Sequence, residues 1–118
     1  MDEKMFKERT KQLAVAIIKK ADALPRSLAT DIISRQLVRS GSSIGANYRA
    51  ACRAKSTADM VNKMKIVEEE SDETEYWLEL LVEAGHVSEE QIKTIYKETD
   101  EILAMTVASI KTFRNRKS

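Results

Sequence analysis

The sequence has few of the residues that break helices or cross-link a chain. Its 118 residues include 3 glycines, 1 proline and 1 cysteine. So few glycine and proline residues leave little material for β-turns, which argues against a strand-rich fold. One cysteine excludes an internal disulfide framework and fits a reducing cytoplasm. We therefore expect one all-α domain over residues 1–118, located in the cytoplasm.

Long apolar runs and an excess charge of one sign are also missing. No run reaches the roughly 18 apolar residues that cross a bilayer. The charged start, residues 1–10, lacks the apolar core of a signal peptide. Apolar residues make up 42% and charged residues 33% of the chain, which excludes a disordered tail and a membrane protein. We expect a soluble protein with no membrane partner.

The few helix-breaking and capping residues divide the chain into four helices. Pro25 pushes the residue before it out of the helical region, and Ser27 can cap the next helix. Ser56 opens a capping box with Asp59 at its third position, and Gly85 suits a helix end. The helices are expected at residues 3–23, 27–53, 57–84 and 88–114. Because the connections are short, the pattern predicts an antiparallel, up-and-down four-helix bundle.

The second half of the chain has the clearest periodicity. Apolar and small residues recur at alternating intervals of three and four, which is the heptad seam of nearly parallel packed helices. The two seams are Met60, Met64, Val67, Ser71, Thr74, Leu78 and Leu81, and Ile92, Ile95, Thr99, Ile102, Thr106, Ser109 and Phe113. The Ser and Thr residues in these seams either fix the helix register or bond back to their own helix; we favour the second interpretation.

The second predicted helix contains two glycines one turn apart, Gly41 and Gly45. Glycine inside a helix costs about 1 kcal/mol relative to alanine. Two explanations stay open: the helix is kinked there, or another backbone approaches it closely. With Tyr48 and the adjacent aromatics Tyr76 and Trp77, these glycines are our candidates for an oligomer interface. Adjacent helical residues point about 100° apart, so at least one of the two aromatics faces outward.

Charge is segregated along the sequence. Residues 26–55 carry six basic residues and one acid, whereas residues 56–85 carry nine acids and two lysines. Within the basic segment, arginines recur at heptad spacing on a stripe about 200° from the apolar row of the same helix. Guanidinium groups suit phosphate because they stay charged and form paired hydrogen bonds. The candidate RNA- or DNA-binding residues are Arg35, Arg39, Arg49, Arg53 and Lys55.

A second interpretation of the arginines remains open. The run 68–75 has six acids in eight residues, enough to pair with every arginine of the stripe within one chain or between subunits. In that case the chain is a protein-interaction or scaffold module that binds no nucleic acid. Both roles can coexist in an oligomer that has one basic and one acidic surface.

Catalytic patterns are not found in the sequence. There is no Gly-rich phosphate loop, no Cys–His zinc spacing and no nucleophile elbow. His86 is the single histidine, so the paired Glu-x-x-His motif of di-iron bundles cannot form. Cys52 is interpreted as a small buried apolar residue. We expect a protein that is not an enzyme and has no cofactor, no metal and no catalytic residue.

Three segments resemble the bacterial four-helix bundle protein family, also called the 23S rRNA intervening-sequence protein family. They are the RSGSSIGAN segment at 39–47, Ala54-Lys55-Ser56 and the KIVEEESDETEYWLELL segment at 65–81. The resemblance extends from about Phe6 to Phe113. It implies an antiparallel four-helix bundle that assembles as a ring-like homopentamer, in a family without a settled biochemical activity.

The resemblance also bears on nucleic-acid binding. A related protein, the accessory factor of diversity-generating retroelements, is a basic pentamer that binds nucleic acid and a reverse transcriptase. By this resemblance Arg35, Arg39, Arg49 and Arg53 would form the basic surface. Ala50 stands where the family often has a glutamate, and the total charge is near neutral. The missing glutamate argues against any role that needs this carboxylate, and the near-neutral charge implies weaker nucleic-acid binding than in the basic relative.

Overall fold

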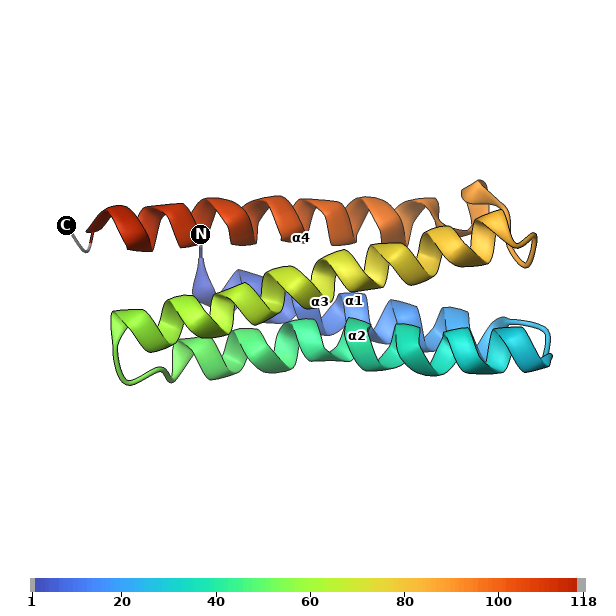
Figure 1. Ribbon diagram of the computed structural model, residues 1–118, viewed down its shortest axis with the longest axis horizontal. Helices are drawn as coiled ribbons and strands as arrows, with labels where there is room; N and C mark the ends of the chain where they lie inside the picture. The colour runs from blue at the N-terminus through green and yellow to red at the C-terminus, as the bar shows by residue number, and fades with distance from the viewer. Residues whose placement is uncertain (1, 117–118) are drawn as a thin grey trace.

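The computed structural model describes residues 2–116, which form four helices packed side by side (Figure 1). The helices are α1 (Glu3–Ala23), α2 (Leu28–Cys52), α3 (Thr57–Glu83) and α4 (Glu89–Arg116). Their connections lie at alternate ends of a rod of 50 × 21 × 20 Å. No strand occurs in the described residues. The all-α class and the four predicted helices are confirmed, with boundaries within two residues of those expected.

Side chains at the predicted positions cap α2 and α3. The Ser27 hydroxyl accepts a hydrogen bond from the Thr30 N–H at 3.1 Å, and the Ser56 hydroxyl accepts one from the Asp59 N–H at 3.1 Å. The helix before Pro25 ends as expected, because the preceding residue has extended backbone angles. These caps satisfy N–H groups that a helix start leaves without partners.

The connection from α3 to α4 is fixed by backbone and side-chain bonds. Gly85 has φ of +82°, and the N–H of His86 donates to the carbonyl of Leu81 at 2.9 Å. This is the left-handed glycine cap with its return hydrogen bond. At the start of α4, Ser88 and Gln91 exchange backbone-to-side-chain bonds of 2.8 and 3.2 Å, a reciprocal capping box.

The core lies along one face of each helix, and it includes most of the two seams predicted for α3 and α4. The largest fully buried side chains come from every helix, and they include Phe6, Ile17, Leu37, Ile44, Met64, Leu78, Leu81 and Ile102. Helix α2 packs against both α1 and α3, and α3 packs against α4. The contact between α1 and α4 is the least extensive of the four.

Polar residues of the seams mostly bond to their own helix, as favoured from the sequence. The hydroxyls of Ser71, Thr99 and Thr106 each donate to the carbonyl four residues earlier at 2.8 Å. Thr74 differs, because its hydroxyl lies 2.9 Å from the hydroxyl of Ser40 on α2, in addition to the Glu70 carbonyl. Thr74 therefore also sets the register of α3 on α2.

The paired glycines of α2 mark a close approach of α1. Helix α2 is continuous through both positions, so the helix does not break there. A Cβ at Gly41 would lie 2.6 Å from Cδ1 of Ile17, and one at Gly45 would lie 3.0 Å from Oγ1 of Thr10. Since Ile17 and Thr10 are buried in α1, larger residues in α2 would force the two helices apart.

An ion pair closes the remaining seam between α1 and α4. The guanidinium of Arg9 donates to both oxygens of Glu98 at 2.9 and 2.6 Å, and to Glu101 at 3.2 Å. The two side chains of the main pair are about 30% exposed. The hydrogen bonds that Arg9 donates to Glu98 raise the pKa of Arg9. A bidentate pair of this kind combines charge with fixed geometry where apolar contact is limited.

The close approach predicts that Gly41→Ala destabilises the bundle by about 1–3 kcal/mol, because the added methyl overpacks against Ile17. In an open helix position the same change would stabilise by about 1 kcal/mol. Chemical denaturation measures the difference. Ser42→Ala, at an exposed position of α2, is the control and should be nearly neutral. A Gly41→Ala protein as stable as the parent would contradict the close packing.

The paired geometry predicts that Arg9→Lys lowers stability by about 1 kcal/mol, because lysine keeps the charge but loses the two-pronged contact with Glu98. Arg35→Lys on α2 is the matched control, since Arg35 is exposed and has no ion pair among the described residues. The midpoint of thermal unfolding should fall for the first variant and stay for the second. Equal midpoints would show that the α1–α4 pair contributes nothing.

Candidate nucleic-acid interface

The outer face of α2 carries the predicted basic residues. Because an α-helix turns about 100° per residue, Arg35 and Arg53 point in the same direction, away from the core. Around the helix axis, Arg39 is rotated by about 40° from this direction toward one side, and Arg49 is rotated by about 40° toward the other side. A heptad stripe drifts in this way around a straight helix. The four arginines are all exposed, so the predicted stripe exists, but it fans out toward two neighbouring helices.

Arg39 leans toward α3 and is held there by acids. It donates to Glu70 at 3.0 Å and to Glu73. The Trp77 indole N–H donates to Glu73 at 3.0 Å and, together with Arg39, lowers the pKa of that carboxyl. The pKa of Arg39 is raised, because the two glutamates outweigh its partial desolvation. Pairing within one chain is thus correct for this arginine.

The other predicted basic residues have no such partners. Arg35, Arg49, Arg53 and Lys55 are exposed, and none of them forms an ion pair within residues 2–116. The acidic run on α3 therefore engages one arginine of the stripe and leaves three. Arg53 is the capping residue after α2, and the Lys55 side chain follows it in the short connection to α3. These residues extend the basic surface to the end of the helix.

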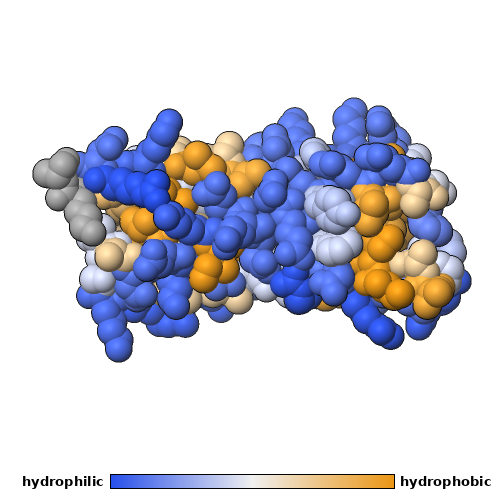
Figure 2. Space-filling model, in the orientation of Figure 1, coloured by the Kyte–Doolittle hydropathy of each residue, from blue (hydrophilic) through white to orange (hydrophobic). Residues whose placement is uncertain are grey.

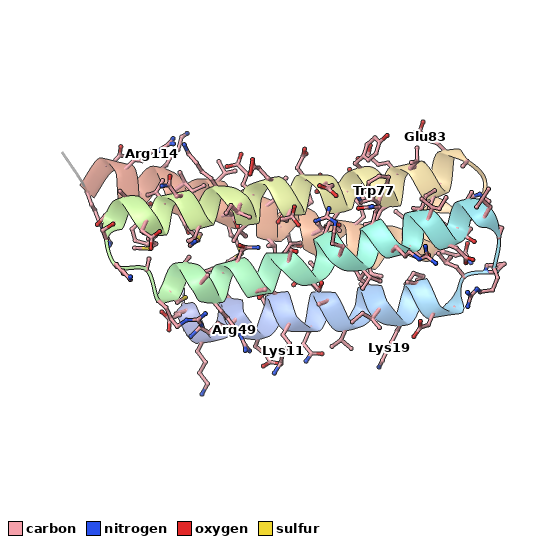
Figure 3. All side chains as sticks on the ribbon, turned by 60° about the horizontal axis from the view of Figure 1, so that its bottom comes forward. Lys11, Lys19, Arg49, Trp77, Glu83 and Arg114 are labelled. Atoms are coloured by element: carbon pink, nitrogen blue, oxygen red, sulfur yellow. The ribbon has the colours of Figure 1, made fainter. Side chains whose placement is uncertain are left out.

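Arg49 leans toward α1 and meets lysines there. A shallow groove of about 290 Å³ runs between the two helices beside Gly45, and its rim carries Lys7, Lys11 and Arg49. Figure 3 shows Lys11, Lys19 and Arg49 along the side of the bundle that α1 and α2 form. The charge is not all of one sign, because Lys11 pairs with Glu8 at 3.5 Å. Hydrogen bonding by Gln12 and the charges of Lys11 and Arg49 lower the pKa of Glu8.

The lysines of α1 are the site residues that sequence reasoning missed. Lys4, Lys7 and Lys11 follow one another at intervals of three and four, so they lie on one face of α1. This spacing could have indicated a basic face on α1 from the sequence alone. The sequence could not show that this face lies next to Arg49, because the packing of α1 on α2 decides it.

The candidate interface residues separate into buried and exposed ones. Gly41 and Tyr48 are buried within their own chain, where the rings of Tyr48 and Phe6 meet edge to face at 4.6 Å. Contacts with α1 account for both residues, and they leave little surface for a second subunit. Tyr76 is 52% exposed, and its ring contacts that of the half-buried Trp77 at 5.0 Å.

The surface of the rod is mixed in character. Figure 2 shows hydrophobic areas toward both ends of one face of the rod and a hydrophilic band between them. Large apolar side chains are exposed on all four helices: Met5, Ile18, Leu28, Ile32, Ile66, Tyr76 and Val107. Surface of this kind is available for association with another protein.

A groove lined mainly by apolar and sulfur-containing side chains lies at one end of the rod. It has a volume of about 640 Å³ and is lined by Cys52, three methionines and Phe113 at the end of the rod where α1 begins. Partial burial raises the pKa of the Cys52 thiol, which disfavours the reactive thiolate form.

Within residues 2–116, no three or more His, Cys, Asp or Glu side chains are grouped so that they could hold a metal ion. In that same part of the chain, no helix has the length and apolar character needed to cross a membrane.

Comparisons with known proteins agree with this architecture. The crystal structure of a protein with unknown function from the S23 ribosomal protein family of Bacteroides thetaiotaomicron is similar, with 38% identity and a TM-score of 0.87. The similarity covers 94% of this chain and 99% of that one. No curated protein matches. Residues 3–108 match the family described as 23S rRNA-intervening sequence protein. The chain belongs to the 23S rRNA-intervening sequence protein family.

Proposed function

We propose that this protein is a non-enzymatic, cytoplasmic homo-oligomer that binds RNA or DNA through the outer face of α2. Its building block is the antiparallel, up-and-down bundle of residues 1–118, and the family resemblance favours five subunits. The binding surface comprises Arg35, Arg49, Arg53 and Lys55, and Lys7 and Lys11 of α1 adjoin it. It uses no cofactor, metal or membrane.

The observation that supports this proposal is the difference between Arg39 and the other arginines. Arg39 already has two carboxylate partners, whereas Arg35, Arg49 and Arg53 are exposed without an ion pair in the described residues. From Arg35 to Arg53 the helix rises about 27 Å, so the three cations can contact a nucleic-acid backbone at several phosphates. Arginine is suited to such contacts because its fork matches phosphate oxygens.

A protein-interaction scaffold without nucleic acid is the alternative, and one observation favours it. Arg39 of α2 is bound by Glu70 and Glu73 of α3, so arginines of this helix can pair with acids of α3. Acids elsewhere on α3, such as Glu69 and Asp72, are exposed. The remaining arginines of one subunit could meet such acids of the next.

Replacing Arg35, Arg49 and Arg53 together by Ala should abolish most nucleic-acid binding in a mobility-shift titration. Each lost phosphate contact should also reduce the slope of log K against log salt by about 0.7–0.9. Arg39 is left in place because it stabilises the bundle. The probes are a single-stranded RNA and a duplex DNA, each tested at two salt concentrations.

The matched control for the arginine variant replaces Lys93, Lys97 and Lys111 of α4 by Ala. These lysines are also exposed, so the control removes the same charge from another helix. It should bind nearly as tightly as the parent. Equal losses in both variants would indicate only a net-charge effect, and no shift of the parent at low salt would remove the nucleic-acid function.

Light scattering on the parent should give about five times the 13.4 kDa chain mass. The arginine variant should keep that mass if its residues bind nucleic acid, and it should fall to smaller species if they join subunits. Trp77→Ala removes an aromatic beside the exposed Tyr76 and tests the other candidate contact. A monomeric parent at micromolar concentration would overturn the oligomer.

A further inference from the structure

Glu75 is an acid in a place where acids are rarely found. It lies on α3 at the seam with α4 and is only 8% exposed. Its Oε2 atom finds no hydrogen-bond partner among the described residues. A buried carboxylate without partners is strongly disfavoured, and such a group either finds a cation or takes up a proton.

The surroundings of Glu75 supply acids instead of a cation. Asp100 of α4, an exposed residue, acts on it from across the seam, and Asp72 and Glu79 are neighbours on α3. Tyr96 of α4 also faces this seam, but its hydroxyl donates to Glu79 at 2.6 Å.

Two basic residues on the neighbouring helices do not compensate Glu75. On the α2 side, Arg39 is bound to Glu70 and Glu73, and Glu73 points about 200° away from Glu75 around α3. On α4, Lys97 stands one turn before Asp100 but is exposed to solvent. The charges that act on Glu75 are therefore dominated by like charges.

We propose that Glu75 is protonated in the folded chain and donates this proton to Asp100 across the α3–α4 seam, and that loss of the proton loosens the bundle. The bridging proton gives Asp100 a donor and removes the buried negative charge from Glu75. When it leaves, two carboxylates face one another with no cation between them. The proposal does not depend on what α2 binds.

The direction of the pH effect follows from the ionisation. Burial, reinforced by Asp100, raises the pKa of Glu75 from 4.5 to about 7. Between these values the folded chain holds a proton that the unfolded chain has lost. Stability from this group is therefore complete below pH 4.5, declines as the pH rises toward 7, and is lost above it.

The decisive variant is Glu75→Gln, which keeps the shape of the side chain and presents an amide donor to Asp100 at every pH. Denaturant unfolding is measured at pH 5 and pH 8. From pH 5 to pH 8 the unfolding equilibrium constant of the parent should increase. This increase should be roughly tenfold to a hundredfold larger than that of the variant. The variant should accordingly be the more stable protein at pH 8.

Two further variants keep the test decisive. Asp100→Asn removes the like charge from the other side of the seam and should also flatten the pH profile. Glu69→Gln, at an exposed position of α3, should leave the profile of the parent unchanged. Infrared spectra near pH 6 should show a protonated carboxyl band that Glu75→Gln lacks.

The proposal would be overturned if the stability of Glu75→Gln and of Asp100→Asn changed with pH in the same way as that of the parent. A Glu75 carboxyl that infrared spectra show to be ionised at pH 5 would overturn it as well. Either result leaves the nucleic-acid titration of the α2 variants unaffected, so failure of the two proposals can be told apart.

Discussion

The close contact between α1 and α2 is the constraint on which the rest of the bundle depends. It exists because Gly41 and Gly45 present bare backbone to Ile17 and Thr10. Once α1 occupies that side of α2 and α3 occupies the other, a single strip of α2 remains outside. The direction of every arginine on this helix follows from that arrangement. The two glycines thus determine which side chains of α2 are exposed on the surface.

The outer strip of α2 is divided because a helix does not repeat after seven residues. The drift carries Arg39 toward α3 and Arg49 toward α1. Arg39 meets Glu70 and Glu73 and becomes part of the fold. Arg49 meets the lysines around the shallow groove and adds to a positive region. Residues that look equivalent in the sequence therefore have different roles, one mainly structural and the other available for a ligand.

The acids of α3 are divided for the same geometric reason. Glu70 and Glu73 face α2, where a guanidinium balances them. Glu75 faces α4, where another acid, Asp100, acts on it; burial and Asp100 raise the pKa of Glu75. At the α1–α4 seam, by contrast, a cation compensates the acids, because Arg9 pairs with two glutamates. Opposite charges therefore meet at the α2–α3 and α1–α4 seams, whereas like charges meet at the α3–α4 seam, where sensitivity to pH is expected.

The sequence by itself determined the helices, their caps and the rows that form the core. These depend on local signals: Pro25, the capping serines, and apolar spacing of three and four. It also determined that basic residues would line the outside of one helix, because that face is opposite the apolar row. Only the tertiary structure decided that the glycines admit α1, that Arg39 has partners whereas Arg49 has none, and that Glu75 is buried against Asp100. Each of these depends on residues far apart in the chain, whose meeting is set by how whole helices pack.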